Sequence, residues 1–571
     1  MLKNIKKYRA PYLFILPFFI LFFLFQLIPT IWTFYISFTE WKGIGDPVWC
    51  GTDNYQKILI DNLFWESLVN TVVYWITGMV LILVLAVIIA SLLNSSSLKH
   101  KSFFKTVTFL PNICAAIAMG LIFRMLFDEN TGLINEFLGM FGVGSVGWLT
   151  DTRYSKIPVI LLNVWRNTPW FTMIVLSGLL NISTDYYEAA TVDGAGKLKQ
   201  FFYITLPLLR NILFFCSITI TVDSWKLFNE SYILPGPGAS NTSLFQYMYE
   251  SGFNVFNMGY ASAIGVVLII ILGILRCSLW REENRESCKE AHMGYKAKRR
   301  WDTVLVYGAL TVISLICIFP IAWMCLISLK PATESISGFH SIIVQDPTLA
   351  NFKRLFEMIP LGQNLFNSVF TTLIGTVTTL YFCALAGFAF AKFRFPGRNF
   401  LFYFVIATML IPPEVGAVPL FILMKKFNLI NSLWSLIIPR IATAVGIFYM
   451  HQYMSDIPDE LIEAARVDGC TDFGIFTKIV LPVIKPALAS WAAITLIARW
   501  NDFFWPLLYL RKSSKYTLMV TISLLPVSEG LSTPWPVILA GTTLVIIPII
   551  LLYLFLQRFQ KSGMMAGAVK G

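Results

Sequence analysis

The chain has 571 residues, of which 56% are hydrophobic and only 13% are charged, and its formal net charge is +12. A water-soluble protein of this length needs far more polar surface. The composition therefore excludes a water-soluble protein and indicates that lipid surrounds most of the chain. The positive charge does not indicate nucleic-acid binding, because no nucleic-acid-binding pattern accompanies it and Lys and Arg gather in the cytoplasmic loops of membrane proteins.

The chain shows no residue pattern typical of a metal site or a catalytic centre. Its nine cysteines and four histidines are dispersed, without a CxxC pair or a disulfide framework, so we expect no metal and no cofactor. A phosphate-binding loop is also missing, because Thr191 and Leu198 stand where the motif around Gly196-Lys197 requires a Gly and a hydroxyl residue. We therefore expect that the chain is not an enzyme.

Twelve apolar stretches are long enough to cross a bilayer as helices. The first one follows basic residues and has no small-residue cleavage site, so we interpret it as a retained span and not as a signal peptide. The stretches of the first half are residues 12–38, 67–93, 103–127, 157–181, 206–234 and 258–280. Those of the second half are residues 303–329, 364–391, 399–424, 432–453, 481–510 and 535–557. We predict an all-α membrane protein with twelve transmembrane helices, arranged as six plus six.

A charged run divides the two sets of spans. Residues 281–300 cannot be buried in lipid, so we predict a linker there between a first half at 1–280 and a second half at 301–571. Each half has an even number of spans, so the linker and both termini lie on the same side of the membrane. Lys and Arg favour that side, which predicts that it is cytoplasmic.

One polar stretch occurs twice in this apolar sequence. Glu188–Ala195, with the sequence EAATVDGA, returns one internal period later as Glu463–Cys470, with the sequence EAARVDGC. Each copy predicts a short helix, a turn at Gly194 or Gly469 with positive φ, and a second helix that leads into the next span. The paired alanines predict a smooth helix face that a second protein can approach closely.

The flanking residues of the two copies predict how each short helix begins and ends. Asp185 and Asp456 are candidate N-caps, and Pro207 and Pro482 fall where the backbone re-enters the membrane. An alternative is that both copies are ordinary amphipathic loop helices, repeated only because a gene duplicated.

The two halves also match ahead of this stretch. Asn54-Tyr55 and Asn351-Phe352 each precede a second span, followed by Ser67 and Ser368 at the membrane entry. Together these matches predict a parallel tandem repeat, with a shared pathway between the halves.

The repeated stretch resembles the cytoplasmic EAA loop of ABC importer permeases. Further motifs resemble the carbohydrate type of this family, which includes maltose, glycerol-phosphate and multiple-sugar permeases, and the resemblance covers nearly the whole chain. These motifs are Leu234–Pro237, Gly259–Ala263, Trp500–Pro506 and the C-terminal tail. The family usually makes the two halves as separate chains, whereas here they are fused.

The resemblance implies partners on both sides of the membrane. In this family the two loops dock into two ABC ATPase subunits, the tail reaches the interface between those subunits, and an external solute-binding protein delivers the substrate. The implied loop contacts are Glu188, Ala189, Ala190, Asp193, Gly194, Glu463, Ala464, Ala465, Asp468 and Gly469. The implied tail contacts are Ala566, Gly567, Ala568, Val569, Lys570 and Gly571.

Several polar residues fall inside the two fifth spans. The spacing of Thr219, Asp223, Lys226 and Glu230 predicts one shared helix face, and Arg499 and Asp502 lie three residues apart in the other half. Charges at membrane depth normally face a cavity or each other, so these residues either line the substrate path or pair across the two halves. The other candidates for the path are Trp500, Asn501 and Trp505. The rings of the two tryptophans would stack on a sugar.

Three further lone charges, Arg166, Glu414 and Arg440, are more typical of paired structural groups than of ligands.

We predict the permease of an ATP-driven importer that moves a carbohydrate or polyol by alternating access. The alternative is an ion-coupled secondary transporter, which also has six plus six spans. Residues 94–99 and 392–396 do not fit the Gly-Asp-Arg type of loop common in such transporters.

Overall fold

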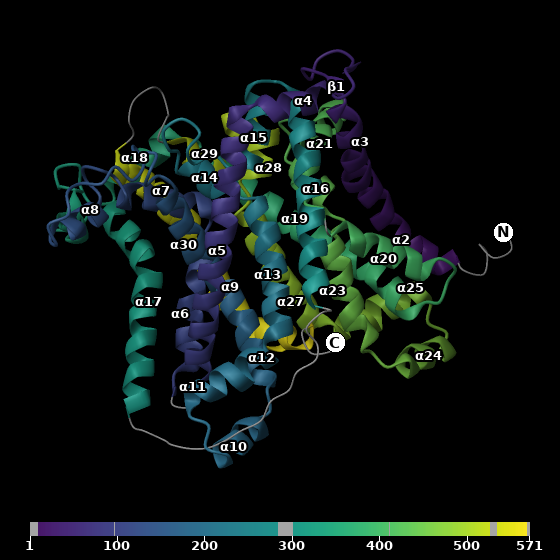
Figure 1. Ribbon diagram of the computed structural model, residues 1–571. Coiled ribbons are helices and arrows are strands. Elements are labelled where there is room, and N and C mark those ends of the chain that lie inside the picture. The colour runs from purple at the N-terminus through teal and green to yellow at the C-terminus, as the bar shows by residue number, and fades with distance from the viewer. Residues whose placement is uncertain (1–8, 96–97, 284–300, 410, 526–533, 568–571) are drawn as a thin grey trace.

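The computed structural model describes residues 9–95, 98–283, 301–409, 411–525 and 534–567, and its helices run mostly side by side (Figure 1). The first half contains α2 Arg9–Phe22, η1 Phe23–Leu27, α3 Ile28–Ser37, β1 Thr39–Glu40, β2 Val48–Trp49, α4 Asp53–Ile60, α5 Asn62–Asn94, α6 Lys101–Ile113, α7 Ala116–Leu126, α8 Leu133–Gly139 and α9 Lys156–Asn181. It continues with α10 Thr184–Val192, α11 Lys197–Gln200, η2 Phe201–Thr205, α12 Leu206–Leu208, α13 Arg210–Trp225, α14 Asn229–Ile233, α15 Leu244–Tyr249, η3 Glu250–Asn254 and α16 Met258–Glu283.

The second half repeats this order. It contains α17 Trp301–Ser328, η4 Gly338–Ile342, α18 Ala350–Met358, α19 Leu361–Lys392, α20 Arg398–Thr408, η5 Pro413–Gly416, α21 Ala417–Lys426, α22 Trp434–Ile437, η6 Ile438–Arg440 and α23 Ala444–Ser455. It continues with α24 Asp459–Val467, α25 Asp472–Ile475, η7 Phe476–Val480, α26 Leu481–Val483, α27 Lys485–Trp500, α28 Phe504–Tyr509, η8 Ser513–Lys515, α29 Leu518–Leu524 and α30 Trp535–Gly567. The short strands β1 and β2 pair antiparallel.

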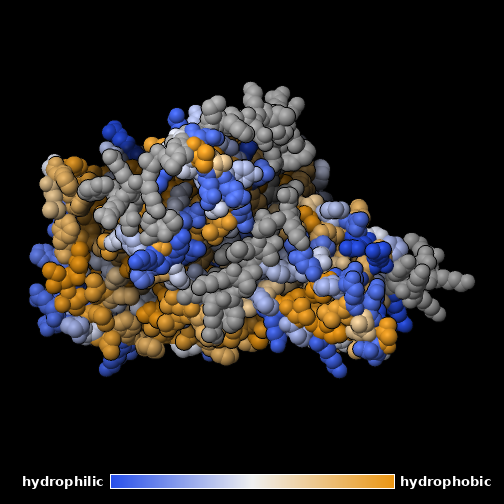
Figure 2. All heavy atoms as spheres, turned by 90° about the horizontal axis from the view of Figure 1, so that it is seen from below, coloured by the Kyte–Doolittle hydropathy of each residue, from blue (hydrophilic) through white to orange (hydrophobic). Residues whose placement is uncertain are grey.

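Helices occupy all twelve predicted segments. Six described helices are long and apolar enough to cross a bilayer by themselves, and four bent helix pairs qualify when each pair counts as one span. The two remaining segments hold α9 and the broken run from α22 to α23. Seen from the end that carries α10, apolar residues cover much of the outer rim (Figure 2). The all-α membrane fold is therefore confirmed.

The third and fifth segments of both halves are sharply bent. The bends are 90° between α6 and α7 and 83° between α20 and α21, and the other two are 65° before α13 and 77° before α27. Proline lies at or near each bend, at Pro111, Pro207, Pro412, Pro413 and Pro482. Because proline donates no backbone hydrogen bond and clashes with the preceding turn, it breaks a helix at these points.

Matched asparagines fix the start of each half. The Nδ2 atom of Asn54 donates to the carbonyls of Ser37 and Thr39, and that of Asn351 donates to the carbonyls of Ser328 and Lys330. Both side chains therefore join the helix before the second span to the end of the first span. This shared geometry confirms the predicted repeat.

The match predicted between Ser67 and Ser368 is wrong. Ser368 Oγ accepts from the N–H of Leu518, and the equivalent bond in the first half goes from the N–H of Leu244 to Thr71. Ser67 lies one helical turn earlier, and its hydroxyl accepts no such bond. The fixed spacing from Asn54 and Asn351 identifies Thr71 as the partner of Ser368.

The first helix of each half packs against the other half. Phe14 of α2 contacts Phe388, Phe393 and Phe476, with ring centroids 5.8 Å, 5.9 Å and 6.1 Å apart. Tyr307 of α17 packs against Phe104, 6.0 Å between centroids. Figure 1 shows α2 beside α20 and α25, and α17 beside α6. The boundaries 1–280 and 301–571 remain a prediction from the sequence. The hydrophobic core contains residues from both of these segments.

Replacing either anchor asparagine with alanine tests the repeat. Asn54→Ala and Asn351→Ala should each destabilise the protein by about 1–3 kcal/mol per carbonyl left unsatisfied. Thermal unfolding of the purified full chain in detergent measures the effect, with the exposed Asn399→Ala as the control. Unchanged unfolding temperatures for both anchor variants would contradict the assigned role.

Candidate functional site: two repeated loops and a polar layer at the helix breaks

The repeated loops, residues 184–200 and 459–475, have the same backbone geometry. Each short helix ends at a glycine with positive φ, +87° at Gly194 and +81° at Gly469. The N–H of the next residue then bonds back to the second alanine of the motif, Ala195 to Ala190 and Cys470 to Ala465. This is the hydrogen-bonding pattern of a helix closed by a left-handed glycine, as the sequence predicts.

The predicted caps of these helices are wrong. Ser183, and not Asp185, caps α10 by accepting from the N–H of Asp185 at 3.2 Å. Pro458 stands at the cap of α24 without a side-chain bond, and Asp456 instead follows the end of α23. In both loops an acidic residue lies in the first helical turn, where it interacts favourably with the helix dipole.

The exposed faces of the two loops match. Glu188, Ala189 and Asp193 are exposed in α10, as are their equivalents Glu463, Ala464 and Asp468 in α24. The second alanine of each pair is buried, Ala190 at 8% and Ala465 at 5% exposed. The predicted face of paired alanines is therefore wrong, because only one alanine of each pair is available to another protein.

Three exposed apolar side chains recur at equivalent positions of the two loops, and the sequence reading missed them. They are Tyr186, Val192 and Leu198 in the first loop, and Leu461, Val467 and Phe473 in the second. Val192 is 72% and Val467 is 88% exposed. Exposed apolar groups in matched sets mark a contact surface for a protein. The fixed internal period, applied to the whole loop, would have identified them.

The second loop is tied to the end of α19. Lys392 Nζ binds Asp459 Oδ1 at 2.7 Å and also donates to the carbonyl of Ile457. The hydrogen bond and positive charge of Lys392 lower the pKa of Asp459. In addition Arg466 pairs with Asp472 at 3.2 Å and lies over the ring of Phe393. The loop therefore moves together with the α19 end.

The loops lie at one end of the molecule, well apart from each other (Figure 1). The predicted tail contacts Ala566 and Gly567 belong to the last turn of α30. Ala568, Val569, Lys570 and Gly571 lie outside the described residues.

In the first half, the polar residues of the fifth segment do not share one face. Helix α13 ends at Trp225, so Lys226 lies just beyond it and Glu230 belongs to the separate helix α14. Lys226 pairs with Asp223 at 2.9 Å, and Glu230 pairs with Arg166 at 3.0 Å. The side chains of Asp223 and Lys226 are 44% and 38% exposed, which at membrane depth indicates a water-accessible space. Thr219, one turn before Asp223, bonds to its own helix.

In the second half, Arg499 does not pair with Asp502. It donates instead to the carbonyls of Leu436 and Arg440 at 3.2 Å and 2.8 Å, and to Thr379 Oγ1 at 2.9 Å. Asp502 pairs with Arg440. Each of these three ion pairs is formed within one half, so the alternative of pairing across the halves is wrong for them. Arg166 and Arg440 are paired groups, as expected, whereas Oε2 of Glu414 accepts no hydrogen bond.

Trp505 does not offer a free ring face. It is 6% exposed and stacks on Tyr509 with the ring centroids 5.7 Å apart. Trp500 is partly buried, and its indole N–H donates to the carbonyl of Val545 at 3.0 Å. Sequence spacing could not show the covering of Trp505, because it does not identify which neighbours cover a ring.

One hydrogen bond joins the breaks of the two halves. Asn501 Nδ2 donates at 2.7 Å to the carbonyl of Ile113, where α6 ends. Glu414, at the break in the third segment of the second half, attracts Lys226 of the first half electrostatically. Helix breaks, charges and amides therefore meet in one region, which we call the central layer: Arg166, Asp223, Lys226, Asn229, Glu230, Glu414, Arg440, Arg499, Asn501 and Asp502.

Aromatic rings of the two halves pack together next to the central layer, just beyond the C-terminal ends of α13 and α27. Phe228 and Phe503 occupy equivalent positions of the repeat and lie 6.3 Å apart between ring centroids. Phe504 packs against Phe228 at 5.2 Å and against Phe245 at 5.1 Å. All four rings are buried.

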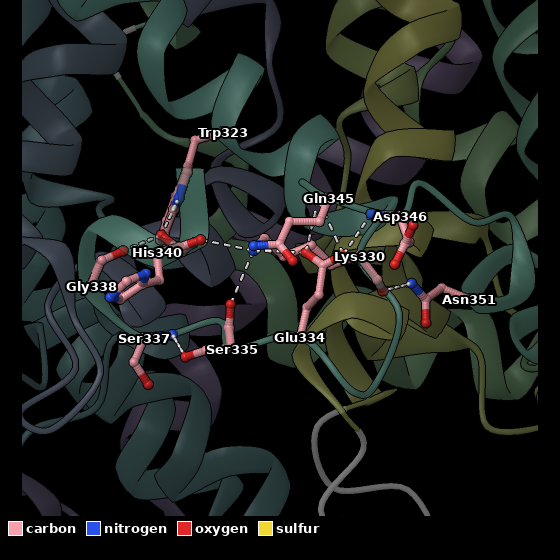
Figure 3. A network of polar contacts seen from close by, with 11 residues as sticks. Trp323, Lys330, Glu334, Ser335, Ser337, Gly338, His340, Gln345, Asp346 and Asn351 are labelled. Carbon is pink, nitrogen blue, oxygen red and sulfur yellow. Dashed lines mark hydrogen bonds and ion pairs between the residues drawn. The ribbon is translucent and has the colours of Figure 1, made fainter. Parts of the chain in front are cut away.

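A segment of the second half after α17 is held together by a network of polar contacts around Lys330 (Figure 3). The buried Lys330 binds the carbonyl of His340 at 2.8 Å and the carboxylate of Glu334 at 3.2 Å. The N–H of Gly338 donates to Thr131 of the first half at 3.0 Å. The halves are therefore joined at this segment as well as through α2 and α17, whereas the two loops themselves lie apart.

Removing the lysine tie should loosen the second loop. In Lys392→Met, hydrogen exchange of backbone amides in residues 457–468 should speed up, because Asp459 and the Ile457 carbonyl lose their donor. Exchange mass spectrometry measures this, with the exposed Lys478→Met, three residues beyond the loop, as the control. The wild-type tie should weaken only as the pH falls through the lowered pKa of Asp459. Equal exchange in both variants would refute the tie.

Comparison with known proteins identifies two related segments. Residues 82–280 and 382–565 each match the family described as "Binding-protein-dependent transport system inner membrane component". The arabinooligosaccharides transport system permease protein AraQ of Halalkalibacterium halodurans is 37% identical over 262 residues, which are 45% of this chain and 93% of AraQ. AraP of Bacillus subtilis, a permease protein of the same kind of system, is 33% identical over 270 residues, 47% of this chain and 86% of AraP.

Among solved structures, a chain of a bacterial ABC transporter involved in the import of the acidic polysaccharide alginate is similar at 26% identity and a TM-score of 0.43, covering 46% of this chain and 99% of that chain. Each of these relatives spans about half of the present chain, as expected for two permease units in one polypeptide. The chain therefore belongs to the family of binding-protein-dependent transport system inner membrane components, and it carries the domain of that family twice.

Proposed function

We propose that this chain is the complete membrane pathway of an ATP-driven importer for a carbohydrate or related polyol. Two separate ATPase subunits supply the energy, and an external solute-binding protein delivers the substrate. The protein resides in the cytoplasmic membrane, with the repeated loops and both termini on the cytoplasmic side. Relatives named for oligosaccharide transport, such as AraQ and AraP, support the choice of a carbohydrate.

The observation that carries the proposal is the matched pair of loops. Two surfaces with the same backbone geometry, the same exposed acids Glu and Asp, and exposed apolar side chains at the same positions support two copies of one kind of partner. In this arrangement a closing ATPase dimer draws the two loops together, and each loop moves the helices of its own half. Gly194 and Gly469 end each short helix firmly, so that it acts as a rigid lever.

The contacts at the opposite end support alternating access. The pair Phe228 and Phe503, together with the Lys330 segment, holds that end closed while the loops are apart. When the loops come together, the ring pair separates and the central layer becomes open to the outside. Such a cycle requires a path that is closed on one side of the membrane while it is accessible from the other.

The central layer is the proposed translocation path. Asp223, Lys226 and Asn501 face the path, with Thr219 on its cytoplasmic side. Glu230, Arg499 and Asp502 hold the broken helices through the bonds described above, and Trp500 and Trp505 pack behind them. Substrate sites of transporters commonly lie where discontinuous helices meet near the middle of the bilayer.

Reversing the charge of both loop glutamates tests the partner. Glu188→Lys combined with Glu463→Lys should abolish copurification with the ATPase subunits, because both exposed acids belong to the contact surface. The amount of protein in the membrane should not change. The control combines Glu66→Lys with Glu357→Lys, which alters two exposed acids at the other end. Normal ATPase binding by the loop variant would refute the docking surface.

Cross-linking the aromatic pair tests the cycle. With Phe228→Cys and Phe503→Cys in one chain, a short thiol-specific cross-linker should hold the outer end shut and stop ATP hydrolysis by the assembled complex. The two single variants, treated with the same reagent, should keep their activity and so control for the native cysteines. Full activity of the cross-linked double variant would contradict opening at this point.

A further inference from the structure

Every basic side chain of the central layer is already bound to acceptors. Arg166 is paired with Glu230, Lys226 with Asp223, and Arg440 with Asp502. Arg499 donates to two carbonyls and a hydroxyl, and Gly375 leaves the room for its guanidinium, since a Cβ there would lie 2.3 Å from Nη1. Each cation of the layer therefore already has an acid or backbone acceptors of the protein as its partner.

The acceptors of the same layer are in surplus. Within the described residues, Oε2 of Glu414, Oδ1 of Asn229 and Oδ1 of Asn501 are buried and accept no hydrogen bond. A buried acceptor without a donor costs about 1–3 kcal/mol, so such atoms are normally paired. Three of them in one region indicate that donors enter from outside the protein.

These acceptors come from both halves and meet at the helix breaks. Glu414 belongs to η5, which packs against the first half: a Cβ on Gly416 would lie 3.4 Å from Pro29, and one on Gly265 would lie 3.2 Å from Val415. Asn229 opens α14, and Asn501 follows α27 and reaches Ile113 of the first half. Separating the halves therefore exposes all three acceptors to the path.

We infer that the central layer selects uncharged, hydroxyl-rich saccharides over sugars that bear a carboxylate, and that Glu414 determines this selection. The inference rests on the proposed sugar import and adds the charge of the substrate to it. Nothing in the family match specifies that charge.

The chemistry follows from the surplus of acceptors. Sugar hydroxyls donate to Glu414, Asn229 and Asn501 and satisfy all three atoms at once. The carboxylate of a uronate meets cations that already have acids or carbonyls as partners, and it lies near the carboxylate of Glu414, whose Oε2 accepts no hydrogen bond. Leaving both charges unpaired in a site with little water is costly, which is the usual way in which a site rejects the wrong ligand.

Paired probes test the inference without the binding protein. The full chain with its ATPase subunits, in lipid nanodiscs, is titrated with two pairs of probes. The first pair is galactobiose and digalacturonate, and the second is cellobiose and its uronate counterpart; arabinobiose is a further neutral probe. Binding is followed by tryptophan fluorescence, because Trp225 and Trp500 adjoin the layer. Neutral members should bind roughly tenfold or more tightly than their uronate partners.

Two variants test whether Glu414 determines the selection between neutral and acidic sugars. Glu414→Lys should raise uronate affinity relative to neutral affinity by roughly tenfold or more, and Glu414→Gln should shift the ratio in the same direction by less. Glu357→Lys, exposed at the outer end, should leave the ratio unchanged. ATPase copurification checks that each variant is folded.

The outcomes are distinct. Equal binding of neutral and acidic probes to the wild type, or an unaltered ratio in both Glu414 variants, overturns the selection while sugar import stands. Binding of no probe at all overturns sugar as the substrate, and the selection with it.

Discussion

Backbone hydrogen bonding inside the bilayer is the constraint on which this structure depends. Lipid offers no partner to a free N–H or C=O group, so a broken helix is stable only where the protein supplies the missing bonds. Here Asn501 binds the carbonyl of Ile113 and Arg499 binds that of Arg440, at breaks in three different segments. The polar side chains of the central layer are therefore both the support of the fold and the chemistry of the proposed path.

The interlocked halves explain how loop motion would reach this layer. Because α2 packs on the second half and α17 on the first, neither half moves as an isolated bundle. In the proposed cycle, the contacts of Phe228 with Phe503 and Phe504 act as the outer gate and the loops act as levers. Fusion of the halves into one chain fixes their ratio at one to one.

Matched positions in the two halves bear on which residues would dock a partner and which would bind substrate. The loops share the residues EAA and VDG and place exposed apolar side chains at equivalent positions, such as Tyr186 with Leu461 and Val192 with Val467, as expected if two copies of one partner bind them. The fifth segments diverge, since Lys226 corresponds to Asn501 and Glu230 to Trp505. A single substrate in a shared path sees both halves at once, so it imposes no such symmetry.

The sequence by itself determined the helical membrane fold, the twelve segments, the repeat and the glycine-ended loops. These features depend on apolar run length, on a fixed internal period and on the backbone freedom of Gly194 and Gly469, all of which are local. Only the tertiary structure decided the cap at Ser183, the burial of Ala190 and Ala465, the partners of Arg499 and Asp502, and the position of Glu414 in the layer. Helical spacing predicts neighbours only within an unbroken helix, and the breaks at the prolines rotate each following residue toward partners distant in the chain.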